Sequence, residues 1–369
     1  MTKTAESLSI YRPKVLLLGI YAAYNKTTFV DSYFEEFINL VKTNGIVYDE
    51  VFFFKLRDID SGTFISKGKL AEIAALCEKH NIDEVIVSEP LTPQQERNLS
   101  NYLHCKVFDR THLILEIFEK AAISAEGKTQ VEIAMLQHRK SRLAGKGIQM
   151  SQQSGVLGMR GGFGETLKEK ERRHIEDTVL KLTRQLSKID QIRETQRKKR
   201  LNQQIPLICL IGYTNAGKST ILNALTNSNV LAEDKLFATL DTTTRELYIG
   251  SQKKVLLSDT VGFIQLLPPQ LINAFKSTLA ELHYAQLLLH IIDIADPNWQ
   301  HHTSIVMNIL HELEVDKPML YVFNKADKIE MTTSLQQQIE KYQPNVVISA
   351  TNEETIKPLT NFLVNYKYT

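Results

Sequence analysis

The segment from Gly212 to Ser219 constrains the fold of this chain more than any other. Its sequence, GYTNAGKS, fits G-x-x-x-x-G-K-[ST] in full, follows the continuous apolar run PLICLIG and precedes the helical stretch STILNAL. A loop of this kind between a buried strand and a helix directs backbone N–H groups at phosphate oxygens, and its lysine and hydroxyl serve the terminal phosphates and Mg²⁺. The sequence therefore predicts a phosphate-binding loop in an α/β domain, in which Lys218 contacts phosphates and Ser219 binds Mg²⁺.

A second motif selects the base of the expected nucleotide. NKAD, residues 324–327, follows the strand-like run MLYVF and resembles the guanine-recognition motif of the GTPase superfamily. Its aspartate accepts from N1–H and the exocyclic amine of guanine, and adenine offers neither donor in that arrangement. SAT, residues 349–351, resembles the companion motif that supports the base. The pair predicts GTP and GDP as substrate and product.

Two further motifs are candidates for switches that sense the nucleotide. DTVG, residues 259–262, ends the run KKVLLSD; Asp259 can hold Mg²⁺ through water and the Gly262 amide can contact the γ-phosphate. FATLDTTTR, residues 237–245, is the candidate first switch, in which Thr239, Thr243 and Thr244 all qualify chemically as a Mg²⁺ ligand. Four motifs in this order predict a GTPase.

Phe263 follows DTVG where many small GTPases carry a glutamine that orients the attacking water. A phenyl ring has no donor or acceptor for that task. Three interpretations stay open: a partner completes the site, the backbone or another side chain orients the water, or Phe263 only packs under the second switch.

Positive charge is concentrated in one part of the chain. Residues 139–200 hold 17 lysines and arginines against 7 aspartates and glutamates, a net charge of +10, whereas the whole chain carries +2 and the remainder therefore about −8. Such a segment is typical of a surface that meets polyphosphates, nucleic acid above all, although a solvated helix face has the same composition.

The same segment has the pattern of a helical hairpin. Ile175, Val179, Leu182, Leu186 and Ile189 repeat at spacings of four and three, a shorter seam of Val131, Met135 and His138 lies upstream, and no proline occurs from 126 to 205. Between the two seams lies SGVLGMRGGFGE, residues 154–165, with five of the chain's 16 glycines. We expect this stretch to form the tip of the hairpin.

The remaining parts alternate strand-like and helix-like periods. From Lys14 to Ala125 this predicts βαβ units around a small parallel sheet, and from Pro206 onward a second α/β domain with a mainly parallel sheet. We therefore expect an N-terminal α/β domain over residues 1–125, the basic helical hairpin over 126–204, and a GTPase domain over 205–369. Within the first of these the isolated histidines are interpreted as surface or packing residues.

Composition also indicates the compartment. The three cysteines lie far apart without paired spacing, which argues against disulfides and against a cysteine-based metal site. No apolar run is long enough to span a bilayer, and the N-terminus lacks the apolar core of a signal peptide. We expect a cytoplasmic monomer without a membrane span.

Together these features resemble HflX-type GTPases, a branch of the translation-factor-related class. The resemblance rests on the basic hairpin before FATLD, DTVGF and NKAD, and on ISKGKLAEI, LTPQQERNL, VFDRTHLILEIF and EGKTQVEIAMLQHRKSRLAGKG, so that it covers most of residues 40–366. It implies binding to rRNA and proteins of the large ribosomal subunit, ribosome-stimulated GTP hydrolysis, and splitting or rescue of stalled or idle ribosomes under stress or antibiotic exposure. It departs from the usual pattern at Phe163 and Thr242, where the family pattern carries proline.

The resemblance also selects site residues. It favours Thr239 over Thr243 and Thr244 as a Mg²⁺ ligand beside Ser219, and it implies catalytic roles for Lys218, Thr239 and Gly262. The hairpin tip would contact RNA through Arg160, Gly161, Gly162 and Phe163. The expected nucleotide-binding residues are Gly212, Tyr213, Thr214, Asn215, Ala216, Gly217, Lys218, Ser219, Phe237, Ala238, Thr239, Leu240, Asp241, Asp259, Thr260, Val261, Gly262, Asn324, Lys325, Ala326, Asp327, Ser349, Ala350 and Thr351.

Two alternative functions remain at this point. The chain could be a signalling or scaffold GTPase whose hairpin grips a protein partner, because the apolar seam suits that equally well. The N-terminal domain could also bind a nucleotide of its own, although it holds no phosphate-cradling motif.

Overall fold

A computed structural model of the chain describes residues 12–22, 24, 29–143, 163–202, 205–226, 236–237, 243–249, 253–268, 271 and 279–368. Its contacts divide the chain into two compact units. The first comprises the described parts of Met1–Lys26 and Gly45–Leu113, and the second those of Thr27–Asn44 and Ile114–Thr369. Residues 27–44 thus belong to the second unit in space, although they precede most of the first unit in sequence. The domain boundaries expected at 125 and 204 stay predictions.

The first unit is built on a four-stranded parallel sheet of order β2-β1-β3-β4. Its strands are β1 (Val15–Tyr21), β2 (Glu50–Lys55), β3 (Glu84–Val87) and β4 (Lys106–Phe108), and helices α2 (Lys67–His80) and α3 (Pro93–Leu103) lie between successive strands in the chain. A capping box of Thr92 and Gln95, with Pro93 in the first turn, sets where α3 begins. This is the small parallel α/β sheet that the alternating pattern predicted.

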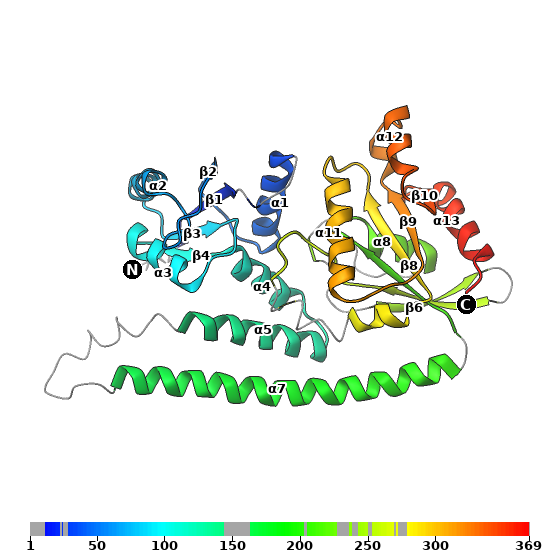
Figure 1. Cartoon of the computed structure of the whole chain (residues 1–369), viewed down its shortest axis with the longest axis horizontal. Coiled ribbons are helices and arrows are strands. Elements are labelled where there is room, and N and C mark those ends of the chain that lie inside the picture. Colours follow the sequence, from blue (N-terminus) through cyan, green and yellow to red (C-terminus); the bar gives the residue numbers. More distant parts are fainter. Residues whose placement is uncertain are drawn as a thin grey trace, which may run out of the picture. The chain divides into compact units, whose positions relative to one another are not determined.

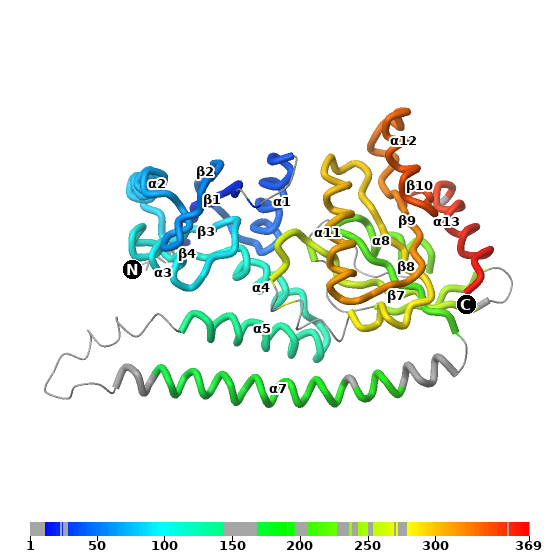
Figure 2. The backbone as a smooth tube through the Cα atoms, viewed as in Figure 1, coloured from blue at the N-terminus to red at the C-terminus, as the bar shows by residue number. Residues whose placement is uncertain are grey.

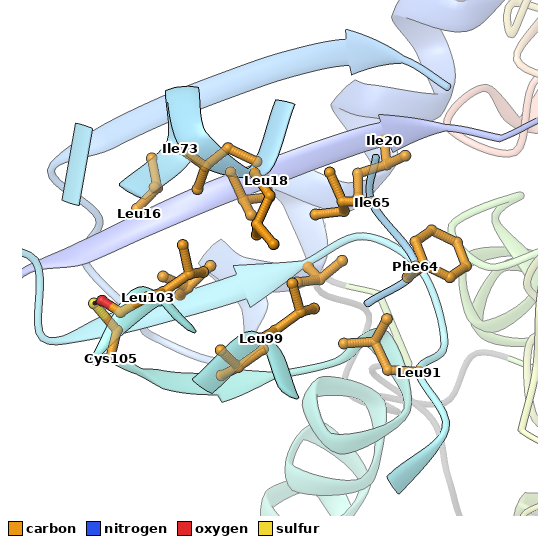
Figure 3. Close-up of a cluster of buried hydrophobic side chains, with 14 of the residues drawn as sticks. Leu16, Leu18, Ile20, Phe64, Ile65, Ile73, Leu91, Leu99, Leu103 and Cys105 are labelled. Atoms are coloured by element: carbon orange, nitrogen blue, oxygen red, sulfur yellow. Dashed lines mark hydrogen bonds between the residues drawn. The ribbon is translucent and has the colours of Figure 1, made fainter. Parts of the chain in front are cut away.

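Burial of β1 holds this unit together. Alternate residues Leu16, Leu18 and Ile20 enter a core with Ile73 of α2 and Leu99 of α3 (Figure 3). Their neighbours along β1 are also buried, as expected for a central parallel strand covered on both faces.

The second unit contains a long helical hairpin. Helix α5 (Ala125–Leu143) runs beside α7 (Phe163–Asn202) in the opposite direction (Figures 1 and 2). Three ion pairs join them: Arg139–Glu171 at 2.6 Å, Lys140–Glu176 at 2.8 Å and Arg193–Glu126 at 2.7 Å.

The apolar seam predicted for the second helix faces inward. Ile175 and Leu182 are buried, and Val179, Leu186 and Ile189 are half-buried, whereas most residues between them are exposed. On α5, Val131 and His138 are buried. The predicted packing of the two helices is therefore confirmed.

The predicted tip loop was too long at its C-terminal end. Phe163 is the first residue of α7, so the backbone of Phe163, Gly164 and Glu165 is helical. Arg160, Gly161 and Gly162 lie outside the described residues.

The rest of the second unit contains a six-stranded sheet of order β10-β9-β8-β5-β7-β6. All neighbours are parallel except β6 and β7. The predicted α/β class with a mainly parallel sheet is confirmed. The strands are β5 (Leu207–Gly212), β6 (Thr243–Ile249), β7 (Lys253–Asp259), β8 (Leu287–Asp293), β9 (Met319–Asn324) and β10 (Asn345–Val347), and the helices are α8 (Lys218–Thr226), η1 (Ala280–Tyr284), α11 (Trp299–Glu312), η2 (Ala326–Lys328), α12 (Thr333–Ile339) and α13 (Glu353–Asn365).

Two helices lie where the chain passes from one unit to the other. Helix α1 (Val30–Thr43) follows β1 in the chain but is grouped with the second unit, and α4 (Arg110–Ala121) spans the division at residue 113. Among the described helices, none is long and apolar enough to cross a membrane.

The hairpin yields a prediction on stability. Ile175 is 3% exposed and Leu180, five residues on, is 51% exposed. Ile175→Ala should lower the free energy of unfolding by about 2–4 kcal/mol, because it leaves a cavity in the seam, whereas Leu180→Ala should change it by less than about 0.5 kcal/mol. Urea denaturation followed by circular dichroism measures both. Equal losses would show that the seam is not packed as described.

Candidate nucleotide-binding site

The sequence motifs meet at one edge of the six-stranded sheet. Neighbouring parallel strands end there together, with Gly212 beside Ile291 and Asp293 beside Asn324. GYTNAGKS continues from β5, DTVG from β7, NKAD from β9 and SAT follows β10. Because the carboxyl ends of parallel strands form the usual binding edge of such a sheet, the fold alone brings these four segments together.

Two glycines of GYTNAGKS are required by close approach. Gly212 has a φ of +151°, and a Cβ there would lie 2.3 Å from the Ile291 carbonyl oxygen. Gly217 has a φ of +95°, and its Cβ would lie 2.3 Å from Nδ2 of Asn324. Neither position has room for a side chain, which explains the two glycines of the pattern.

Lys218 lies under this loop and is 6% exposed. Its Nζ donates to the carbonyl oxygens of Tyr213 at 2.8 Å and Gly212 at 3.2 Å. Burial lowers the pKa of its ammonium to about 8, and the nearby Asp259 carboxylate acts in the opposite direction. A polyphosphate on the loop would supply the negative charge that favours the ammonium form.

Oxygen atoms that suit Mg²⁺ as ligands lie near Lys218. The Ser219 hydroxyl, in the first turn of α8, donates to Oδ2 of Asp259 at 2.6 Å, and Asp259 is fully buried at the end of β7. Mg²⁺ prefers hard oxygen ligands, so this pair fits the ion. No cluster of three or more His, Cys, Asp or Glu side chains suited to a metal occurs among the described residues.

The candidate first switch is described only in part. Ala238, Thr239, Leu240 and Asp241 lie outside the described residues. Phe237 is buried with its ring 4.5 Å from that of Phe118, an apolar contact. Thr243 and Thr244 begin β6, where the Thr244 hydroxyl is 3.2 Å from that of Ser258.

The DTVG segment lies directly against the phosphate-binding loop. Thr214 N donates to the carbonyl oxygen of Phe263 at 2.7 Å, and Phe263 N donates to that of Gly212 at 3.1 Å. A Cβ on Gly262 would lie 3.0 Å from Nζ of Lys218. The backbone of Gly262 is therefore close to the Lys218 ammonium.

Other side chains of this segment turn inward. Thr260 and Val261 are buried, and the Thr260 hydroxyl donates to the carbonyl oxygen of Leu210 at 2.6 Å. Phe263 is 2% exposed. The structure thus agrees with a packing role for Phe263 and gives its side chain no position from which to orient water.

The base motif is tied to the phosphate loop by Asn324, which is 2% exposed. Its Nδ2 donates to the carbonyl oxygen of Ala216 at 2.8 Å, and its Oδ1 accepts from Ala350 N at 3.0 Å. Ala326 N donates to the carbonyl oxygen of Ile348. One amide side chain therefore joins three of the predicted segments.

Asp327 is exposed at the rim of this arrangement. The Ser349 hydroxyl donates to its Oδ1 at 2.5 Å, and this hydrogen bond lowers the pKa of the Asp327 carboxyl below its ordinary value. Thr351 Oγ1 is 3.0 Å from Ser349 Oγ. The carboxylate is thus kept ionised as an acceptor, the state that recognition of guanine requires.

Sequence reasoning missed two contributors to the site. Asp293, at the end of β8, pairs with Lys325 at 2.6 Å and so fixes a residue of the base motif. Its signal was an acid directly after a buried strand. Glu36 of α1 bonds to Tyr213 of the phosphate loop, and nothing in the sequence indicates a contact over that separation.

Comparisons with known proteins agree with this geometry. Three family models match successive parts of the chain: GTP-binding GTPase N-terminal over residues 31–119, GTP-binding GTPase Middle Region over 121–200, and 50S ribosome-binding GTPase over 207–325. A crystal structure described as SsGBP in complex with GDP superimposes with a TM-score of 0.51 at 27% identity, covering 95% of this chain and 99% of that one.

Curated relatives are closer in sequence. The GTPase HflX of Caldanaerobacter subterraneus subsp. tengcongensis is 46% identical over 281 residues, a match that spans 76% of this chain and 65% of that relative's length. The GTPase HflX of Magnetococcus marinus is 42% identical over 332 residues, 89% of this chain and 76% of the relative. The GTPase HflX of Escherichia coli is 39% identical over 314 residues, 85% of this chain and 74% of the relative.

The position of Asp327 yields a prediction on base choice. Asp327→Asn should weaken GDP binding by about a hundredfold, because an amide reverses one hydrogen-bond polarity, and should make xanthosine diphosphate the better ligand. Titration with fluorescent analogues of both nucleotides measures this. The exposed Asp316 provides a matched control, Asp316→Asn, which should bind like the parent. Retained preference for guanine in Asp327→Asn would show that another residue reads the base.

Proposed function

This chain belongs to the HflX family of GTPases, enzymes that hydrolyse GTP, and from that premise we propose that it acts on the large ribosomal subunit in the cytoplasm. There it splits or rescues stalled or idle ribosomes under stress or antibiotic exposure. GTP and Mg²⁺ bind at the edge of the six-stranded sheet, and the basic hairpin docks on rRNA. The family model described as a 50S ribosome-binding GTPase, which matches residues 207–325, supports this proposal.

We assign a task in hydrolysis to the following residues of the nucleotide site. Backbone N–H groups of residues 212–219 hold the phosphates, and Lys218 places its ammonium on the terminal ones. Ser219 directly, and Asp259 through water, would hold Mg²⁺, which would supply positive charge to the phosphates. The Gly262 amide senses the γ-phosphate, and Asp327 accepts from guanine. Support comes from the 2.6 Å contact of Ser219 with Asp259 and from the position of Gly262 against Lys218.

One observation on the hairpin carries the ribosomal part of the proposal. Lys181, Arg184 and Lys188 are all exposed and follow one another at spacings of three and four residues, so they share one face of α7. Within the described part of the chain these three form no ion pair, whereas Arg139, Lys140 and Arg193 pair with carboxylates inside the hairpin. We call Lys181, Arg184 and Lys188 the basic stripe. Such a stripe suits phosphates of an RNA backbone.

The apolar seam of the hairpin favours RNA over a protein partner. Ile175 and Leu182 are already buried within the hairpin, so the chain itself covers the surface that a partner helix would need. What α7 offers to solvent in this region is mainly charge. The roles proposed for Arg160, Gly161, Gly162 and Phe163 at the tip, and for Thr239 as a Mg²⁺ ligand, rest on the family resemblance.

The basic stripe gives the test of this function. Purified large ribosomal subunits should stimulate GTP turnover by the parent chain. Replacing Lys181, Arg184 and Lys188 together by glutamine should raise the subunit concentration for half-stimulation at least about tenfold at moderate salt, and lower the log–log salt slope by about two to three units, because three phosphate contacts are lost.

A control with the same charge change separates contact from net charge. Lys341, Lys357 and Lys367 are exposed outside the hairpin, and their triple replacement by glutamine should leave stimulation as in the parent. An equal loss of stimulation in both triple variants would show that the basic stripe does not contact the subunit. Absence of any stimulation of the parent chain by large subunits would contradict the proposed function itself.

A further inference from the structure

Tyr213, the second residue of the phosphate-binding loop, joins three parts of the second unit. Its ring stacks on His302 of α11, with centroids 3.8 Å apart and an angle of 6° between the planes. Its hydroxyl donates to Oε2 of Glu36 on α1 at 2.5 Å and accepts from Gln265 N at 2.8 Å. Tyr213 is 8% exposed and Gln265 is 9% exposed, so these bonds are largely shielded from water.

The bond from Gln265 completes the attachment of the second switch to the phosphate loop. Two backbone bonds already join Phe263 to Gly212 and Thr214. The Tyr213 hydroxyl adds a third point two residues further along, beyond the reach of the loop backbone. Phe263 and Gln265 are thereby both held, and Gly262, whose amide would contact a γ-phosphate, directly precedes Phe263.

Helix α1 is itself anchored on the same unit. Asn298, which caps α11, accepts from Phe29 N at 3.3 Å and donates from Nδ2 to the carbonyl oxygen of Phe29 at 3.2 Å. This reciprocal pair holds the residue before α1, two turns from Glu36. The Glu36 carboxyl is thus presented to Tyr213 by a helix that lies outside the GTPase motifs in the sequence.

We infer that Tyr213 is a positioning residue of GTP hydrolysis, through which Glu36 of α1 fixes the switch segment Gly262–Gln265. The hydroxyl has a single proton, which it donates in the hydrogen bond to the Glu36 carboxylate. Its lone pairs then face Gln265 N–H, and the two bonds reinforce one another. Preorganised backbone donors contribute most when they need no rearrangement during the reaction. The link therefore acts on the chemical step more than on nucleotide affinity.

The inference rests on the GTPase activity of the family and not on ribosome binding. Its test uses basal turnover of the full chain without ribosomes, so that failure here and failure of the ribosomal proposal are distinguishable. Tyr213→Phe keeps the ring on His302 and removes only the hydroxyl. Glu36→Ala removes the acceptor of its proton, and Glu36→Gln retains an oxygen that accepts it.

Tyr213→Phe and Glu36→Ala should each lower basal kcat about tenfold, the rate equivalent of one net hydrogen bond, with the Kd for GDP changed less than about twofold. The double variant should be no slower than Tyr213→Phe alone, because Glu36 acts through the hydroxyl. Glu36→Gln should turn over like the parent, as should Glu35→Ala, which alters an exposed neighbour on α1.

Three results would overturn the inference. Additive losses in the double variant would show that Glu36 and Tyr213 act separately. A loss of GDP affinity at unchanged kcat would make Tyr213 a ligand-binding residue only. If Glu36→Gln turned over as slowly as Glu36→Ala, the hydrogen bond from Tyr213 to residue 36 would not be the cause of the lower kcat.

Discussion

The side chain of Asn324 fixes the nucleotide site, and the rest of the arrangement depends on it. It donates to the phosphate loop at Ala216 and accepts from the base-supporting segment at Ala350, at 2.8 and 3.0 Å. Aspartate would offer no donor and leucine neither group, so only an amide of this length joins both. The same side chain leaves no room for a Cβ at Gly217. One buried side chain therefore joins the segments predicted to bind the phosphates and the base.

The chain is organised differently in space and in sequence. Helix α1 lies in the region matched by the N-terminal family model, yet it is grouped with the nucleotide-binding unit and bonds to Tyr213. The hairpin covers its own apolar seam and leaves the basic stripe exposed. One element outside the GTPase motifs thus contacts the phosphate-binding loop, and another presents exposed positive charge.

The sequence predicted those features that a local residue pattern determines, namely the elements and their buried faces. The apolar run before GYTNAGKS, the 4-3 spacing around Ile175 and the alternation in residues 14–125 each specify an element and its buried face. The order of motifs also placed Ser219 near Asp259, because parallel strands end together. The Glu36–Tyr213 bond had no such signal, because it joins elements distant in the chain. The partner of Asp293 and the inward position of Phe263 also depend on tertiary packing, which the sequence pattern alone does not determine. The end of the tip loop at Phe163 was missed because glycine-rich composition outweighed the helical charge pattern that follows it.

If the chain acts on the large ribosomal subunit as proposed, its docking there should depend on the bound nucleotide. Sedimentation of the purified chain with large subunits, in a non-hydrolysable GTP analogue and in GDP, tests it most directly. We expect the chain to pellet with the subunits in the analogue, to stay in the supernatant in GDP, and to be released from the pellet by added salt. Equal amounts in the pellet with both nucleotides, or none with either, would contradict it.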